Sequence, residues 1–117
     1  MVKIAQIPVG SMLNFSYIVY DEKNSIGAII DPSWDLEKLL VFLEKNNITA
    51  KYIINTHTHF DHILGNDFIA EVTKAEIIQH EKSTQKKERS VVDHEEISIG
   101  EVNLEVLYTP GHSDDSI

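Results

Sequence analysis

The sequence of 117 residues contains no cysteine, so it can form neither a disulfide nor a thiolate metal site. Any strong metal site must therefore use imidazole and carboxylate groups. Basic residues are also scarce: ten Lys and Arg stand against nineteen Asp and Glu, and the formal net charge is -9. A field of this sign repels polyanions, so we expect no nucleic-acid partner.

Long apolar runs are missing as well. No stretch has the roughly 18 consecutive apolar residues that a membrane helix needs, and the N-terminus lacks the layout of a secretory signal. The sequence therefore predicts a cytoplasmic protein with no membrane partner. We also expect its substrate to be a small molecule. The 42% hydrophobic content is enough for one core, and we expect one domain over residues 1–117.

The first part of the chain predicts a β-meander. Three short segments rich in β-branched and aromatic residues, 3–9, 14–20 and 26–30, are separated by turn-forming sequences. Pro8 favours an edge position for the first of them, because proline cannot donate a hydrogen bond to a neighbouring strand.

A helix is predicted next, because leucines recur at the spacing of one helix face: Leu36, Leu39, Leu40 and Leu43. Ser33 or Asp35 can cap its start. The mostly apolar segment 51–56 follows and is typical of a buried strand.

The second half predicts a helix through 68–72, a strand at 76–79, a loose or helical stretch at 80–90, and a hairpin of 97–100 and 102–108. This order indicates a mixed α/β (α+β) fold with a mixed β-sheet and helices on one face. Nothing in the sequence covers the other face, so we expect an apolar surface that could join two copies of the chain in a homodimer.

A dense run of metal-binding side chains, His57-Thr58-His59-Phe60-Asp61-His62, follows the predicted strand 51–56. Residues two apart in extended backbone point the same way, so His57 and His59 can face one point in space. A turn after them lets Asp61 and His62 face a second point nearby. The run predicts two divalent metal ions, Zn²⁺ first, with Fe²⁺ or Mn²⁺ as alternatives.

His112 is the next candidate ligand. It follows a predicted strand and the tight turn 110–111, which can swing its ring back toward His57 and His59. A third neutral nitrogen is what a catalytic zinc needs, although a histidine after Pro-Gly can also be a plain turn residue.

Other polar residues are interpreted as surface. His80 and His94 lie in polar surroundings away from these runs. Residues 91–117 hold many Asp and Glu and no Lys or Arg, which indicates a solvated acidic face.

The run 56–62 and the sequence Thr109-Pro110-Gly111-His112-Ser113 resemble the second and third motifs of the metallo-β-lactamase superfamily, particularly its glyoxalase II (hydroxyacylglutathione hydrolase) branch. Ile29-Ile30-Asp31-Pro32 is similar to the first motif, in which an Asp supports the metal loop from the second coordination shell. Asp31 can also simply begin a turn before proline.

This resemblance implies an αββα sandwich. Three residues would hold one metal, and two more would contribute to the other: His57, His59 and His112, then Asp61 and His62. The family completes the second site with a further Asp and a final His from its C-terminal half, which this sequence lacks. We therefore expect residues 1–117 to be a single incomplete metallo-β-lactamase-like domain, covering the N-terminal half of the fold.

Three functions remain open. The first is hydrolysis of a thioester or related acyl substrate by metal-bound hydroxide, with Asp61 as the catalytic residue that orients the water or accepts its proton. The second resembles persulfide dioxygenases, which use one iron held by the equivalents of His57 and His112 and a later Asp. The third is a non-catalytic metal-binding fragment that needs its missing half. We expect the parent protein to be a metallo-hydrolase and this chain to be inactive or weakly active alone.

Overall fold

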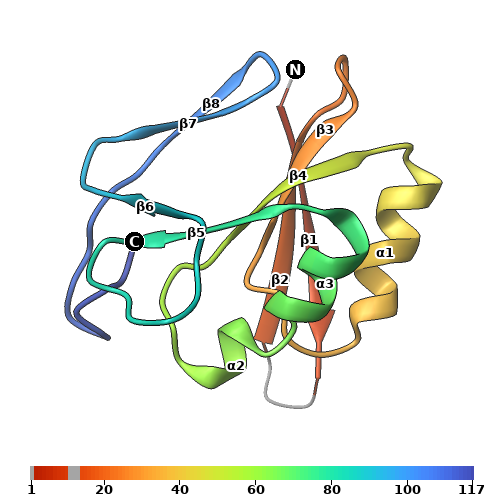
Figure 1. The fold of residues 1–117 in the computed structure, drawn as a ribbon. Helices are drawn as coiled ribbons and strands as arrows, with labels where there is room; N and C mark the ends of the chain where they lie inside the picture. Colours follow the sequence, from red (N-terminus) through yellow and green to blue (C-terminus); the bar gives the residue numbers. More distant parts are fainter. Residues whose placement is uncertain (1, 11–13) are drawn as a thin grey trace.

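The computed structural model describes residues 2–10 and 14–117, and its centre is one mixed sheet in the order β1-β2-β3-β4-β5-β6 (Figure 1). The strands β1 (Val2–Val9), β2 (Asn14–Asp21) and β3 (Ile26–Ile30) form the predicted antiparallel meander. The strands β4 (Thr49–Ile54), β5 (Glu76–His80) and β6 (Arg89–Val91) continue the sheet in parallel. The mixed α/β class is therefore confirmed.

Two helices, α1 (Leu36–Lys45) and α3 (Asn66–Thr73), cover one face of this sheet over a core of buried isoleucines and leucines (Figure 1). The leucine spacing predicted α1 correctly, but neither proposed cap side chain makes a capping hydrogen bond to its first turn. Asp35 instead accepts a hydrogen bond from the backbone N–H of Gly10 at 2.8 Å. The Ser33 hydroxyl is buried and has no hydrogen-bond partner among the described residues.

The opposite face is covered in part, which corrects the expectation that nothing in the sequence covers it. β7 (Glu96–Ile99) and β8 (Val102–Glu105) form the predicted hairpin, and Figure 1 shows it on the side of the sheet away from the helices. Ile97 and Ile99 pack there with buried residues of β3 to β6. The missed contact is non-local, because it joins a hairpin to strands far away in the sequence.

Asp21, at the end of β2, fastens this hairpin to the sheet. Its carboxylate accepts the side-chain N–H of Asn24 at 2.6 Å and the backbone N–H of Glu101 at 2.8 Å. These two hydrogen bonds, the Asn24 one first, lower the pKa of Asp21 to about 2. The carboxylate is therefore ionised at neutral pH, and it ties the β7–β8 turn to the β2–β3 turn.

The part of this face over β1 and the start of β2 stays open. Ile4 pairs in register with Val19, which pairs with Ala28 of the hairpin-covered core, so Ile4 lies on the same face. Ile4 and Phe15 remain 67% and 41% exposed. The predicted uncovered surface is thus confined to the antiparallel end of the sheet.

One local prediction needs its ends corrected, and another was wrong. Residues 81–88 have no helix or strand, in line with the loose alternative for 80–90, but His80 lies in β5 and residues 89–90 lie in β6. The interpretation of His80 as a surface residue was wrong. His80 is only 4% exposed, and its ring stacks on that of Tyr108 with centroids 4.1 Å apart. His94 is exposed, as predicted. Within the described residues, no helix is long and apolar enough to cross a membrane.

Candidate metal centre

The histidine run leaves the sheet at the end of β4, between β3 and β5. Backbone hydrogen bonds from Asp31 N to Ile54 O and from Asn55 N to Ile78 O hold this end on both sides. The backbone at His59 is still extended, and the chain then turns into a short helix, α2 (Phe60–Ile63), which the sequence did not predict. That turn brings the next polar residues, Asp61 and His62, round toward the first two histidines.

Three histidines meet at this end of the sheet. The ring centroids of His57 and His59 are 4.7 Å apart, and each lies 4.8 Å from the centroid of His112. One ring nitrogen from each residue lies within 4.8 Å of the other two, so the three could hold a metal ion together. The structure therefore brings together the three residues that the sequence placed at one metal.

Asp61 and His62 lie beside this group. The His62 ring centroid is 4.1 Å from that of His57, and its Nε2 is 3.7 Å from Asp61 Oδ2. Asn14, at the start of β2, donates to the same carboxylate oxygen at 3.1 Å and lowers the pKa of Asp61. No sequence signal indicated this role for Asn14, since only the fold brings the start of β2 to the loop.

Asp31 is buried and contacts the loop through both of its carboxylate oxygens. It accepts hydrogen bonds from the Thr56 backbone N–H at 2.8 Å, the Thr56 hydroxyl at 2.6 Å and His62 Nδ1–H at 2.9 Å. The bond to Asp31 raises the pKa of His62 above its ordinary value. The residue adopts a positive φ of 55°, a conformation in which Asp is tolerated better than most side chains.

The tautomer and protonation state of His57 suit the binding of a cation. The Thr56 hydroxyl gives its one hydrogen to Asp31, so it accepts from His57 Nδ1–H at 3.1 Å, and the ring's lone pair is left on Nε2. That Nε2 is buried and has no hydrogen-bond partner among the described residues. Burial, followed by the neighbouring His62, lowers the pKa of His57. A neutral imidazole with a bare, buried nitrogen is the form in which histidine binds divalent metals.

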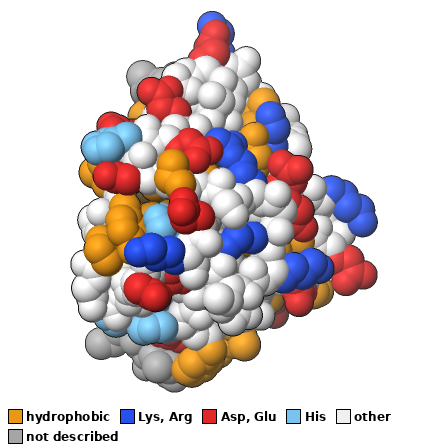
Figure 2. All heavy atoms as spheres, turned by 60° about the vertical axis from the view of Figure 1, so that its left-hand side comes forward, with side chains coloured by type: hydrophobic (Ala, Val, Ile, Leu, Met, Phe, Trp, Pro, Cys, Tyr) orange, Lys and Arg blue, Asp and Glu red, His pale blue; other side chains and the backbone are white. Residues whose placement is uncertain are grey.

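Asp115 is a residue that the sequence interpretation missed, because it stands in the acidic run that predicted a solvated face. It is only 4% exposed. Burial would raise its pKa, but hydrogen bonds from the hydroxyls of Ser113, Thr58 and Ser83 outweigh burial and lower the pKa to about 2. Acidic side chains elsewhere are interspersed with basic ones over the face shown in Figure 2.

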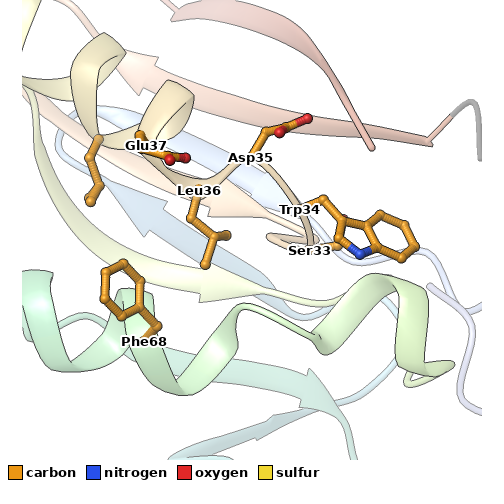
Figure 3. Close-up of a pocket in the computed structure, with 7 residues that line it drawn as sticks. Ser33, Trp34, Asp35, Leu36, Glu37 and Phe68 are labelled. Carbon is orange, nitrogen blue, oxygen red and sulfur yellow. The ribbon is translucent and has the colours of Figure 1, made fainter. Parts of the chain in front are cut away.

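An apolar pocket of about 450 Å³ lies between the start of α1 and α3 (Figure 3). Its lining comes from the loop before α1, from α1 and from α3: Ser33, Trp34, Asp35, Leu36, Glu37, Leu40 and Phe68. The Trp34 ring also meets Phe60 edge-on at 6.4 Å, and Phe60 is a neighbour of His59 in the sequence. None of the histidine donors lines this pocket, so we assign it no part in the metal centre.

Comparison with known proteins places these observations in a family. The model of the metallo-beta-lactamase superfamily matches residues 10–117. A hydroxyacylglutathione hydrolase of Pelagibacter ubique is 31% identical over an alignment of 108 residues, and the match covers 86% of this chain and 43% of that protein. A probable polyketide biosynthesis zinc-dependent hydrolase of Bacillus subtilis is 31% identical over an alignment of 106 residues, and the match covers 86% of this chain and 47% of that protein. The chain thus spans less than half the length of these relatives.

Solved structures agree. ETHE1 from Myxococcus xanthus is similar with a TM-score of 0.90 and 26% identity, over 97% of this chain and 51% of that one. The BLEG-1 B3 metallo-beta-lactamase is similar with a TM-score of 0.86 and 25% identity, over 97% of this chain and 65% of that one. The fold described above is therefore the one these enzymes share over their matched parts.

Proposed function

Because the chain belongs to the metallo-β-lactamase superfamily, we propose that it is the metal-binding N-terminal part of a metal-dependent hydrolase of thioester or related acyl substrates. The observation that carries the proposal is the convergence of His57, His59 and His112, with a bare nitrogen already present on the first. The sequence likeness to hydroxyacylglutathione hydrolases supports the substrate class.

In this proposal His57, His59 and His112 hold one divalent metal, Zn²⁺ first. Asp61 and His62 contribute to a second metal, whose remaining ligands come from outside this chain. A metal held there supplies Lewis acidity and lowers the pKa of water to near neutrality when bound.

Asp31 and Asp61 have different roles at the metal centre. Asp31 holds His62 in one orientation through a 2.9 Å hydrogen bond. The lowered pKa of Asp61 keeps this carboxylate ionised at neutral pH. An ionised carboxylate of low pKa is a good ligand and hydrogen-bond acceptor but a weak base. We therefore assign Asp61 the task of binding metal and orienting water rather than storing its proton.

The second candidate is an iron enzyme of the persulfide dioxygenase type, which would use His57 and His112 but not His59. The likeness to ETHE1 keeps this candidate open. The rings of His57 and His59 lie equally close to the ring of His112, with centroids 4.8 Å away in both cases. His59 is therefore as well placed to bind the metal as His57, which favours the hydrolase.

Metal analysis tests the proposal directly. The purified chain is stripped of metal, and its affinities for Zn²⁺ and Fe²⁺ are measured by competition with a chromophoric chelator. We expect tight Zn²⁺ binding and little or no hydrolysis of an acyl-glutathione thioester by the 117-residue chain alone. Hydrolysis should appear in the longer parent protein. Iron in place of zinc, with oxygen consumed in the presence of a persulfide, would establish the second candidate instead.

The open face over β1 and the start of β2 supports one further expectation, that two copies of the chain associate there. Exposed apolar residues such as Ile4 and Phe15 favour burial against another surface. Sedimentation of the isolated chain tests this, and a monomer at high concentration would contradict it. The cytoplasmic location also stays a prediction.

A further inference from the structure

Asp115 is not part of the histidine run and is not one of the three candidate metal donors. Its carboxylate is nevertheless buried and contacts residues next to those donors. We propose that Asp115 is a positioning residue of the metal centre, because it joins the turn that carries His112 to the loop that carries the other two histidines. The inference rests on the metal centre proposed above, but it concerns a residue that binds no metal itself.

Three hydroxyl groups converge on this carboxylate. Asp115 Oδ2 accepts hydrogen bonds from Thr58 Oγ1 at 2.5 Å and from Ser83 Oγ at 2.8 Å. Its Oδ1 accepts from Ser113 Oγ at 2.5 Å. The partners come from three separate segments: the histidine run, the loop between β5 and β6, and the turn after β8.

Two of the three hydroxyl partners of Asp115 are sequence neighbours of the donor histidines. Thr58 stands between His57 and His59, and in extended backbone its side chain points away from theirs. Ser113 directly follows His112. The carboxylate of Asp115 thus holds the immediate neighbours of all three donors, and among the described residues it makes no hydrogen bond to their rings.

The turn at His112 needs such a support. No helix or strand occurs between β8 and the last described residue, and Gly111 there has a φ of 147°. His62 is oriented by a hydrogen bond to Asp31, whereas the His112 ring has no hydrogen-bond partner in the described part of the chain. The direction of the His112 ring therefore depends on its backbone. The bonds to Asp115 fasten this backbone together with the backbone hydrogen bonds from Gly111 N to Ser113 O and from Ile117 N to Thr56 O.

A purely structural role predicts a different result from a positioning role. If the network only stabilised the fold, its loss would lower the free energy of unfolding and leave the folded site unchanged. If it positions the donors, its loss also weakens metal binding by the folded chain. Outer residues that orient metal ligands typically contribute about 10- to 100-fold in affinity.

The test compares Zn²⁺ affinity in four variants of the full chain by chelator competition, at a temperature where each is folded. Asp115→Asn keeps the shape but removes the charge and replaces one accepting oxygen with an N–H donor, and Thr58→Val removes the hydroxyl; both are expected to weaken binding by about tenfold or more. Thr58→Ser keeps the hydroxyl and should stay within about threefold of wild type. Asp114→Asn removes the same charge from the exposed neighbouring residue and should stay within about twofold.

Substitution with Co²⁺ gives a readout that stability alone does not move. Its visible absorption bands report ligand geometry, and we expect them to change in Asp115→Asn but not in Asp114→Asn. An unchanged spectrum together with unchanged affinity in Asp115→Asn would overturn the positioning role, as would equal losses in Thr58→Val and Thr58→Ser. If Asp115→Asn does not fold, the Thr58 pair decides. Failure of the wild-type chain itself to bind Zn²⁺ or Co²⁺ would overturn the metal centre, and this role with it.

Discussion

The two segments that supply the candidate donors are held in place by different means. The loop at 55–62 continues a central strand, is bonded on both sides by backbone groups, and carries a buried His57. The turn at 109–117 has no regular secondary structure and exposes His112. It is fastened by side-chain hydroxyls around Asp115 and by a few backbone hydrogen bonds, one of which runs from Ile117 N to Thr56 O at 2.8 Å. One half of the site is thus positioned by the sheet, and the other half by a small polar network with isolated backbone hydrogen bonds.

Removing one histidine from each segment should have the largest effect on metal binding. We expect His57→Ala and His112→Ala each to weaken Zn²⁺ binding by more than about 100-fold, since even an outer partner contributes 10- to 100-fold. His94→Ala, at an exposed histidine outside the donor group, should leave the affinity unchanged. An equal loss in His94→Ala would show that zinc binds elsewhere.

Asp31→Ala should have the largest effect on stability, because it removes the acceptor that holds the loop at 55–62 in place. It leaves the Thr56 N–H, the Thr56 hydroxyl and His62 Nδ1–H without their acceptor in a buried place. We expect a loss of about 3 kcal/mol in the free energy of unfolding of the metal-free chain, measured in urea. The exposed Asp67→Ala serves as control and should change it by less than about 0.5 kcal/mol.

Low pH should remove the stability that the hydrogen bonds to Asp115 contribute. The pKa of Asp115 is lowered from 3.8 to about 2 in the folded chain, so the ionised form stabilises the fold above about pH 4, and this contribution is lost as the pH falls to 2. The stability gap between wild type and Asp115→Asn should therefore shrink by about 2 kcal/mol over that range.

Asp21 is a matched control for this measurement, because its pKa is also lowered to about 2. Asp21→Asn should show the same direction of change in acid, yet leave Zn²⁺ affinity unchanged, since Asp21 fastens the hairpin. Unfolding is followed by circular dichroism from pH 5 to pH 2. A gap that stays constant for Asp115→Asn would contradict the ionised state assigned to it.

Gly111→Ala should give the smallest effect. A side chain there would meet no atom within 4 Å, so the cost comes only from the backbone φ of 147°. We expect a loss of about 1 kcal/mol in the free energy of unfolding. Zn²⁺ binding should weaken a few-fold because the neighbouring His112 shifts. Wild-type values for both quantities would show that the turn tolerates other backbone conformations.

The sequence predicted the half of the site that the sheet builds. Helical spacing of leucines located α1, and alternation in extended backbone explained how His57 and His59 face one point. His112 was predicted from a turn signal and a motif, and the structure brings its ring to the other two. Each of these signals lies within a short stretch of the sequence, so it can be recognised without knowledge of the fold.

The sequence could not predict contacts that depend on three-dimensional packing. Asp115 looked like any member of an acidic run, because its partners at 58 and 83 lie far away in the chain. His80 looked exposed until the Tyr108 ring was found stacked on it. The hairpin itself was predicted, but its docking on the sheet was not, since pairing is local and docking is not.

The distance in sequence between the donors has a consequence for how this protein behaves in solution. An ion that bridges the loop after β4 and the turn at His112 can bind them together only in the folded chain. Mass action then adds about 2.7 kcal/mol at a hundredfold excess of ion over its dissociation constant. The melting temperature should therefore rise with free zinc and fall when a chelator is added, so it would report the composition of the buffer as much as the chain itself.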